Sequence, residues 1–155
     1  MRIDLRALCL LGMVLLLAAC SGGTESPEEQ IRQLIATGVE AAESRSANAF
    51  EDLLHPNYLD QKGNRRNQTL TLMRGMFLRH KNVYLFTKIG DIDLQSETEA
   101  TVYMHVAMAS QSISDVTALA SLRAQLYEFE LQVIKDETWR VMQARWQPAK
   151  LSDIE

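Results

Sequence analysis

The chain has 155 residues, a length that fits one domain able to bury most of its apolar surface. Its 16 basic and 20 acidic residues give a formal net charge of −4, which argues against general binding to nucleic acid. Both cysteines, Cys9 and Cys20, lie within the first 20 residues. The rest of the chain therefore offers no disulfide, no CxxC redox motif and no cysteine nucleophile.

The first 20 residues have the pattern of a targeting segment. Arg2 and Arg6 form a basic head, and residues 7–17 form an apolar run too short to span a bilayer as a mature helix. Small residues then precede Cys20, so the sequence Leu-Ala-Ala-Cys resembles the lipobox of bacterial lipoproteins. The resemblance implies that residues 1–19 are a signal peptide and that Cys20 becomes a palmitate-type acylated N-terminus.

The lipid anchor also predicts a location. Acyl chains contribute about 0.8 kcal/mol per buried methylene, so several of them hold a small domain stably on a membrane. Position 21 is Ser rather than Asp, which by resemblance to enterobacterial sorting implies the outer membrane, facing the periplasm. The alternatives are an ordinary signal with a coincidental cysteine or an uncleaved membrane anchor. Cleavage removes two basic and one acidic residue, which leaves 14 and 19 and a net charge of −5.

The mature chain begins with a tether and three predicted helices. Residues 20–25 are expected to be an acylated flexible tether, and residues 26–155 a single domain. Ser26, Pro27 and Glu29 form a capping box before apolar residues at helical spacing, which predicts a helix over 26–45. A short helix is expected over 46–54, where Pro56 ends it, and another over 68–80, with an extended piece and a turn over 58–64 between them.

In the second half of the chain, apolar and polar residues alternate with a period of two. This alternation of apolar and polar residues predicts four strands, over 83–89, 100–108, 127–133 and 139–146. After the first of them, residues 92–94 resume the alternation one residue out of step. That slip at Gly90 predicts a bulge or a strong bend. The long connection over 110–122, with a helical turn capped by Asp115, is expected to cover an open end of the domain. The fold class is therefore α+β, with N-terminal helices packed on one face of a bent antiparallel sheet.

The order of these elements and a few anchor residues resemble the nuclear transport factor 2-like superfamily, which includes ketosteroid isomerase and scytalone dehydratase. The anchors are His-Pro at 55–56, Tyr-x-Asp-x-x-Gly at 58–63 and Trp-Arg-Val-x-x-x-x-Trp at 139–146. The resemblance covers residues 26–148. It implies a cone in which the sheet wraps the long helix and leaves a pocket, and often a homodimer through the outer sheet face. The alternative is a cystatin-like or other helix-on-sheet domain, although a cystatin-like domain usually has one helix before its sheet.

Family members that catalyse proton transfer use a carboxylate or His base with Tyr or Asp donors. The catalytic candidates are two pairs, Tyr58 with Asp60 and Tyr103 with His105. In each pair the residues are two apart, so an extended chain puts both side chains on one side. Simpler readings compete with each pair. Asp60 is a natural turn residue, and Tyr103 and His105 can form the wetter face of an edge strand. His80 is explained by the favourable position of a cation at a helix end.

No metal or cofactor is expected. The three histidines are scattered, and neither a phosphate-binding glycine loop nor a serine nucleophile elbow is present. Methionine and aromatic residues are the candidates for contact with an apolar ligand: Met73, Phe77, Met104 and Trp146. The competing explanation is that they fill gaps in an ordinary core.

The segment from Gln61 to Gly90 holds seven basic residues and no Asp or Glu. This asymmetry stands out in an acidic chain, and Lys62, Arg65 and Arg66 are candidates for contact with an anionic surface. The surface could be lipid phosphate, a glycan or an acidic protein. A solvated helix face balanced by the acidic strands would also explain the pattern.

Two main functions remain open from the sequence. The first is a non-catalytic module at the membrane that binds a small ligand or a periplasmic protein. The second is a small cofactor-free enzyme of the isomerase or dehydratase type, and a purely structural dimer is the third possibility. The discriminating observation is whether a carboxylate or an imidazole lies inside an apolar pocket.

Overall fold

The structure is a computed structural model that describes residues 25–121 and 124–154. The predicted signal peptide, Cys20 and most of the predicted tether lie outside these residues. The elements in chain order are α2 (Pro27–Glu43), α3 (Ala49–Leu53), β1 (Leu54–Asp60), α4 (Arg66–Arg79), β2 (Tyr84–Leu94), β3 (Glu99–Ala109), α5 (Val116–Ser121), β4 (Gln125–Lys135), β5 (Trp139–Pro148) and the 3₁₀ turn η2 (Leu151–Asp153). The predicted helices and strands are confirmed, with ends that shift by a few residues. In the described ranges, no helix has both the length and the apolar character needed to span a membrane.

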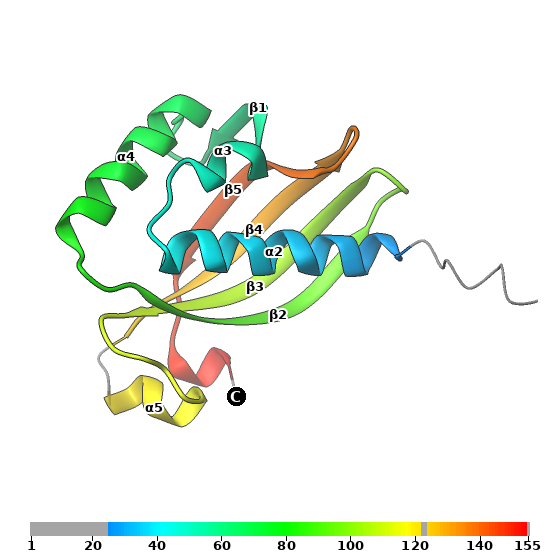
Figure 1. The fold of residues 1–155 in the computed structure, drawn as a ribbon. Helices are drawn as coiled ribbons and strands as arrows, with labels where there is room; N and C mark the ends of the chain where they lie inside the picture. Colours follow the sequence, from blue (N-terminus) through cyan, green and yellow to red (C-terminus); the bar gives the residue numbers. More distant parts are fainter. Residues whose placement is uncertain (1–24, 122–123, 155) are drawn as a thin grey trace, which may run out of the picture.

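One five-stranded sheet has the order β1-β5-β4-β3-β2, and α2 lies across its concave face (Figure 1). Strands β2 to β5 form the expected antiparallel meander. Strand β1 pairs in parallel with β5, so the sheet is mixed at this edge rather than wholly antiparallel. Leu54 and His55 open β1 instead of ending a helix, and Pro56 is tolerated there because β1 is an edge strand.

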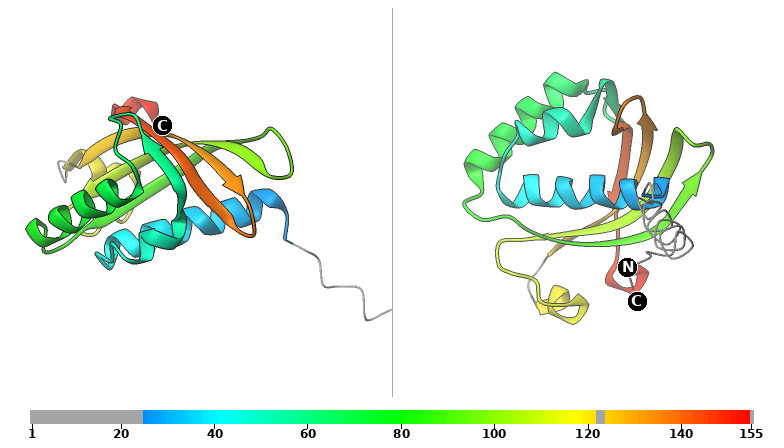
Figure 2. Two further views of the ribbon diagram at one scale, coloured as in Figure 1. Left: turned by 90° about the horizontal axis from the view of Figure 1, so that it is seen from above. Right: turned by 45° about the vertical axis from the view of Figure 1, so that its right-hand side comes forward.

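The sheet bends around α2, as two views from other sides show (Figure 2). The register of β2 on β3 shifts between Ile89 and Asp91, which confirms the predicted bulge at Gly90. A Cβ at Gly90 would lie 3.4 Å from the carbonyl oxygen of Tyr103, so the glycine permits the close approach of the two backbones. A second shift, between Gln132 and Val133, bends β4 on β5.

Helix α2 begins as the capping box predicts. Ser26 has extended backbone angles, and its hydroxyl oxygen accepts a hydrogen bond from the Glu29 N–H at 3.2 Å. The helix then buries Ile31, Leu34 and Ile35 against the sheet, where they join the main apolar core. This core lies between α2 and the concave face.

The outer face of the sheet has a covering of its own. Ala107 points away from α2 and is buried by Leu119 of α5 and by Ile154 after the C-terminal turn. Asp115 caps α5 as expected, because its Oδ1 accepts from the Ala118 N–H at 3.0 Å. The expectation that residues 110–122 cover the open end of the cone is wrong for the described part of that range, because Ile113, Val116 and Leu119 pack on the outer face instead. The homodimer predicted through that face stays a prediction.

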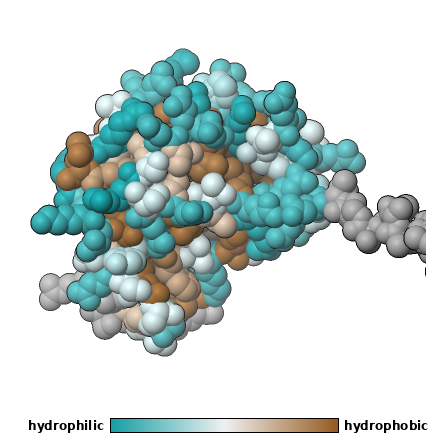
Figure 3. Space-filling view, in the orientation of Figure 1, coloured by the Kyte–Doolittle hydropathy of each residue, from teal (hydrophilic) through white to brown (hydrophobic). Residues whose placement is uncertain are grey.

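Apolar side chains also reach the surface. In the orientation of Figure 1, apolar surface is visible near the middle of the molecule and around α5, among hydrophilic residues (Figure 3). Leu72 and Leu78 of α4 and Tyr103 of β3 are among the exposed large apolar residues. Single exposed apolar residues are ordinary on protein surfaces, so only those beside a cavity or a cleft are evidence for a binding site.

Candidate functional site

An apolar cavity of about 210 Å³ lies between α2 and the concave face of the sheet. Helices α2 and α3 form one side, with Gly38 and Phe50 among the lining residues, and the sheet forms the other, with Met104 and Phe129. Such a cavity, mostly apolar with few polar groups, is the usual form of a small-ligand site. It is the candidate site of this protein.

Gly38 contributes to the open volume of this cavity. It lies in the middle of α2, where glycine costs about 1 kcal/mol relative to alanine. A Cβ at this position would meet Leu53 Cδ1 at 3.9 Å, so ordinary packing does not exclude a side chain. Gly38 was not among the residues predicted from the sequence, although a glycine inside an amphipathic helix is a signal that points to such a position.

Tyr58 and Thr87 are the polar residues among the described lining, although the Tyr58 hydroxyl lies beside Thr69 of α4, which does not line the cavity. Tyr58 is buried on β1, and burial together with the negative charge of Asp60 raises the pKa of Tyr58 to about 12. The phenol is therefore protonated at neutral pH. It can donate a hydrogen bond, but it is a poor base.

Asp60 is buried beside Tyr58, so the structure brings this predicted pair together. Its carboxylate is engaged by the turn that follows. Oδ1 accepts from the backbone N–H groups of Lys62 and Asn64, both at 2.8 Å, and Oδ2 accepts from Asn64 Nδ2 at 2.9 Å. Gly63 completes the turn with a φ of +82°. Asp60 therefore acts as the turn residue that its sequence context also allowed, and it does not line the cavity.

The second predicted pair lies on the opposite face of the sheet. Met104 points into the core, so its neighbours Tyr103 and His105 point outward. Tyr103 borders a separate outer groove of about 270 Å³ with Glu130 and Arg145. His105 lies near Asp153 of the C-terminal turn. The sheet therefore separates Tyr103 and His105 from Tyr58 and Asp60, and the four do not form one site.

The other histidines also lie away from the cavity. His55 is buried at the start of β1, where its Nε2 lies 3.2 Å from Asp136 Oδ2 and its Nδ1 accepts from the Asn57 N–H at 3.0 Å. His80 ends α4. Among the described residues that line the cavity there is neither a carboxylate nor an imidazole. Over the same described ranges, no three His, Cys, Asp or Glu residues are grouped so that they could hold a metal ion.

The predicted apolar ligand contacts divide between two places. Met104 lines the cavity, and Trp146 stacks on Phe129, a lining residue, with ring centres 5.9 Å apart. Met73 and Phe77 belong instead to a second apolar cluster, formed where α4 packs near the ends of β2 and β3. Met104 is therefore the one of the four that lines the cavity, whereas Trp146 packs behind Phe129 and also borders the outer groove.

Two of the three basic candidates have partners inside the protein. Lys62 Nζ lies 5.5 Å from the centre of the Trp146 ring, and Arg66 Nη2 lies 3.7 Å from Glu51 Oε1. Arg65 precedes α4, and its N–H donates to Gln68 Oε1 at 2.9 Å. Their contact with an anionic surface stays a prediction.

Neither a family model nor a curated protein sequence matches this chain. Solved structures do match. A protein from Novosphingobium aromaticivorans assigned to the scytalone dehydratases has a TM-score of 0.67 at 14% identity, covering 79% of this chain and 84% of its own. A nuclear transport factor 2-like protein of unknown function from Shewanella oneidensis has a TM-score of 0.62 at 19% identity, covering 77% and 98%. The domain has the nuclear transport factor 2-like fold.

A structure from Nostoc punctiforme described as having a cystatin-like fold is also similar, with a TM-score of 0.63 at 15% identity over 82% of this chain and 80% of that one. Identities this low show a shared nuclear transport factor 2-like architecture and nothing about chemistry. The function must therefore be argued from the residues of the cavity.

Proposed function

We propose that this nuclear transport factor 2-like domain is a non-catalytic binding module for a small apolar molecule, held at the cell envelope by lipid on Cys20. The observation that carries the proposal is the cavity of about 210 Å³, whose lining is almost wholly apolar. A cavity of about 150 Å³ with such a lining already accepts benzene. The cavity described here would accept a one-ring or two-ring molecule or a short alkyl chain.

The chemistry of the lining supports binding rather than proton transfer. An isomerase or dehydratase needs a base within hydrogen-bond reach of its substrate. The phenol of Tyr58 stays protonated at neutral pH, and the oxygens of Asp60 already accept three hydrogen bonds from the turn. The enzyme alternative would therefore need a base that comes from outside the described lining.

The evidence for the lipid anchor of the proposed module is the sequence Leu-Ala-Ala-Cys at residues 17–20. Helix α2 begins at Pro27, only a few residues after Cys20, so the proposed lipid would keep the domain close to the membrane surface. Ser21 favours the periplasmic side of the outer membrane for this location. An apolar ligand that partitions into membranes would be within reach of the cavity there.

The proposal is tested by filling the cavity from Gly38. We expect Gly38→Leu to occupy the ligand volume and, because leucine favours helix more than glycine, to leave the domain folded. The matched control is Ala36→Leu, on an exposed position of the same helix. Both are made in residues 20–155 with Cys20→Ser, so that no lipid enters the cavity, and naphthalene is the neutral probe.

Naphthalene binding is followed by ligand-detected NMR. We expect the wild-type sequence and Ala36→Leu to bind with the same affinity, and Gly38→Leu to bind about tenfold more weakly or not at all, because overpacking excludes the probe. Equal binding by all three proteins would contradict the assignment of the cavity as the ligand site.

A further inference from the structure

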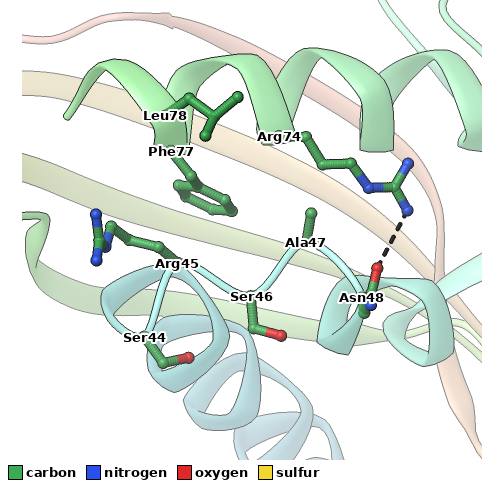
Figure 4. Close-up of a pocket in the computed structure, with 8 residues that line it drawn as sticks. All are labelled: Ser44, Arg45, Ser46, Ala47, Asn48, Arg74, Phe77 and Leu78. Carbon is green, nitrogen blue, oxygen red and sulfur yellow. Dashed lines mark hydrogen bonds between the residues drawn. The ribbon is translucent and has the colours of Figure 1, made fainter. Parts of the chain in front are cut away.

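We propose that a second site, the cleft between residues 44–48 and α4, binds the head group of an anionic amphiphile, a phosphate or carboxylate that carries an alkyl chain. The cleft has a volume of about 630 Å³, and Arg45 and Arg74 lie at its two ends with Ala47 and Phe77 between them (Figure 4). None of its lining residues lines the cone cavity. The inference therefore does not depend on the function proposed above.

Neither arginine of the cleft makes an ion pair with another described residue. Arg45 Nη1 donates to the carbonyl oxygen of His80 at 3.3 Å, and Arg74 Nη2 donates to Asn48 Oδ1 at 3.2 Å; both acceptors are neutral. Within the part of the chain that the structure describes, neither arginine has a carboxylate within 4.0 Å, and no Asp or Glu lines the cleft. A guanidinium has five donors in a fork that matches a carboxylate or phosphate, so most of these donors are still available.

The apolar part of the cleft indicates that the anion carries a chain. Phe77 and Ala47 are buried between the two arginines, whereas Leu78 is 87% exposed beside them. A free inorganic anion would gain nothing from these side chains. An alkyl chain next to a head group would lose its contact with water against Leu78, the exposed apolar side chain of the cleft.

The backbone of Arg45 gives a further reason to assign its side chain a role. Arg45 follows α2 with a φ of +56°, the one non-glycine residue of positive φ among those the structure describes. The N–H of Ser46 donates to Ala41 O at 2.9 Å and that of Arg45 to Ala42 O at 3.0 Å, the Schellman pattern that ends many helices. Glycine is the usual residue at this position because it has no Cβ to strain. An arginine in this conformation carries backbone strain that a glycine would not.

This geometry supplies a sharp variant, because Arg45→Gly removes the guanidinium and relieves the backbone strain together. Its thermal midpoint should be no lower than that of the wild type, so that weaker binding cannot be ascribed to unfolding. Arg74→Gln removes the second charge. Arg32→Gln is the charge-matched control, since Arg32 is exposed on α2 and does not line the cleft.

The test titrates residues 20–155 carrying Cys20→Ser with dihexanoyl phosphatidylglycerol below its micelle concentration, followed by amide chemical shifts. We expect shifts at residues 44–48 and 74–78, and Arg45→Gly and Arg74→Gln each to weaken the Kd about tenfold. Arg32→Gln and the cavity variant Gly38→Leu should bind as the wild type does. An equal Kd for all variants, or shifts confined to other residues, would overturn the proposal.

Three comparisons separate the chemical sources of the anion. If dihexanoyl phosphatidylcholine binds as tightly as the phosphatidylglycerol, the cleft does not select an anion and the proposal is overturned. If inorganic phosphate binds as tightly, the alkyl chain contributes nothing and its proposed role is overturned. If vesicles of anionic lipid capture the protein through Arg45 and Arg74 while the soluble lipid shifts none of the cleft amides, a membrane surface replaces the single head group and the proposal fails.

Discussion

Replacing Ile31 by alanine should lower the free energy of unfolding by about 3 to 4 kcal/mol. Ile31 is fully buried, with 0% exposure, at the centre of the contact between α2 and the concave face of the sheet. Removal of its side chain loses the transfer free energy of the apolar atoms and leaves a void that close-packed neighbours only partly fill. Denaturant titration of the two proteins measures the difference.

Ile31→Val serves as the graded control. It deletes a single methylene, so we expect a loss of about 1 kcal/mol. A domain of this size has a total stability of about 5–15 kcal/mol, so the alanine variant should still fold. A loss below about 1 kcal/mol for Ile31→Ala would contradict the packing of α2 across the sheet.

Replacing Asp60 by alanine should cost about 3 kcal/mol of stability. The change leaves the N–H groups of Lys62 and Asn64 and the side-chain amide of Asn64 without their acceptor, next to a buried position. Asp60→Asn keeps one carbonyl oxygen for the two backbone donors. We therefore expect it to lose about 1 kcal/mol.

The same two variants separate a turn residue from a catalytic or ligand-binding one. In Asp60→Asn the cavity lining is unchanged, so naphthalene should bind with the wild-type affinity. Loss of naphthalene binding by an Asp60→Asn protein that is still folded would contradict the structural role given to Asp60.

Local chemistry made much of the fold predictable. The capping box at Ser26 and the apolar spacing after it place α2 almost to the residue, and the slip of alternation at Gly90 locates the bulge that bends the sheet. These features depend on neighbours in sequence. Pairing of β1 with β5 joins residues more than 80 positions apart, and the short run after Pro56 carries no signal of which edge it meets.

The candidate site was predictable only in part, for two physical reasons. Alternation puts Tyr103 and His105 on one face of a strand, but it takes the packed structure to show that this face looks away from α2. A cavity is a volume that side chains leave unfilled, so no residue pattern encodes it directly. The clearest indication of it in the sequence is Gly38, a glycine inside a helix that lines the cavity. Arg45 was not predicted as a site residue because it precedes the basic segment 61–90 in the sequence. Only the fold brings it to the same cleft as Arg74 of that segment.

The most direct measurement is a crystal structure of residues 20–155, with Cys20→Ser, soaked with 1-bromonaphthalene and recorded at the bromine absorption edge. If the cavity is the ligand site, an anomalous bromine peak appears between α2 and the sheet, beside Gly38, Phe50 and Met104. A cavity closed by the side chains of Phe50 and Met104, with no bromine inside, would contradict that assignment.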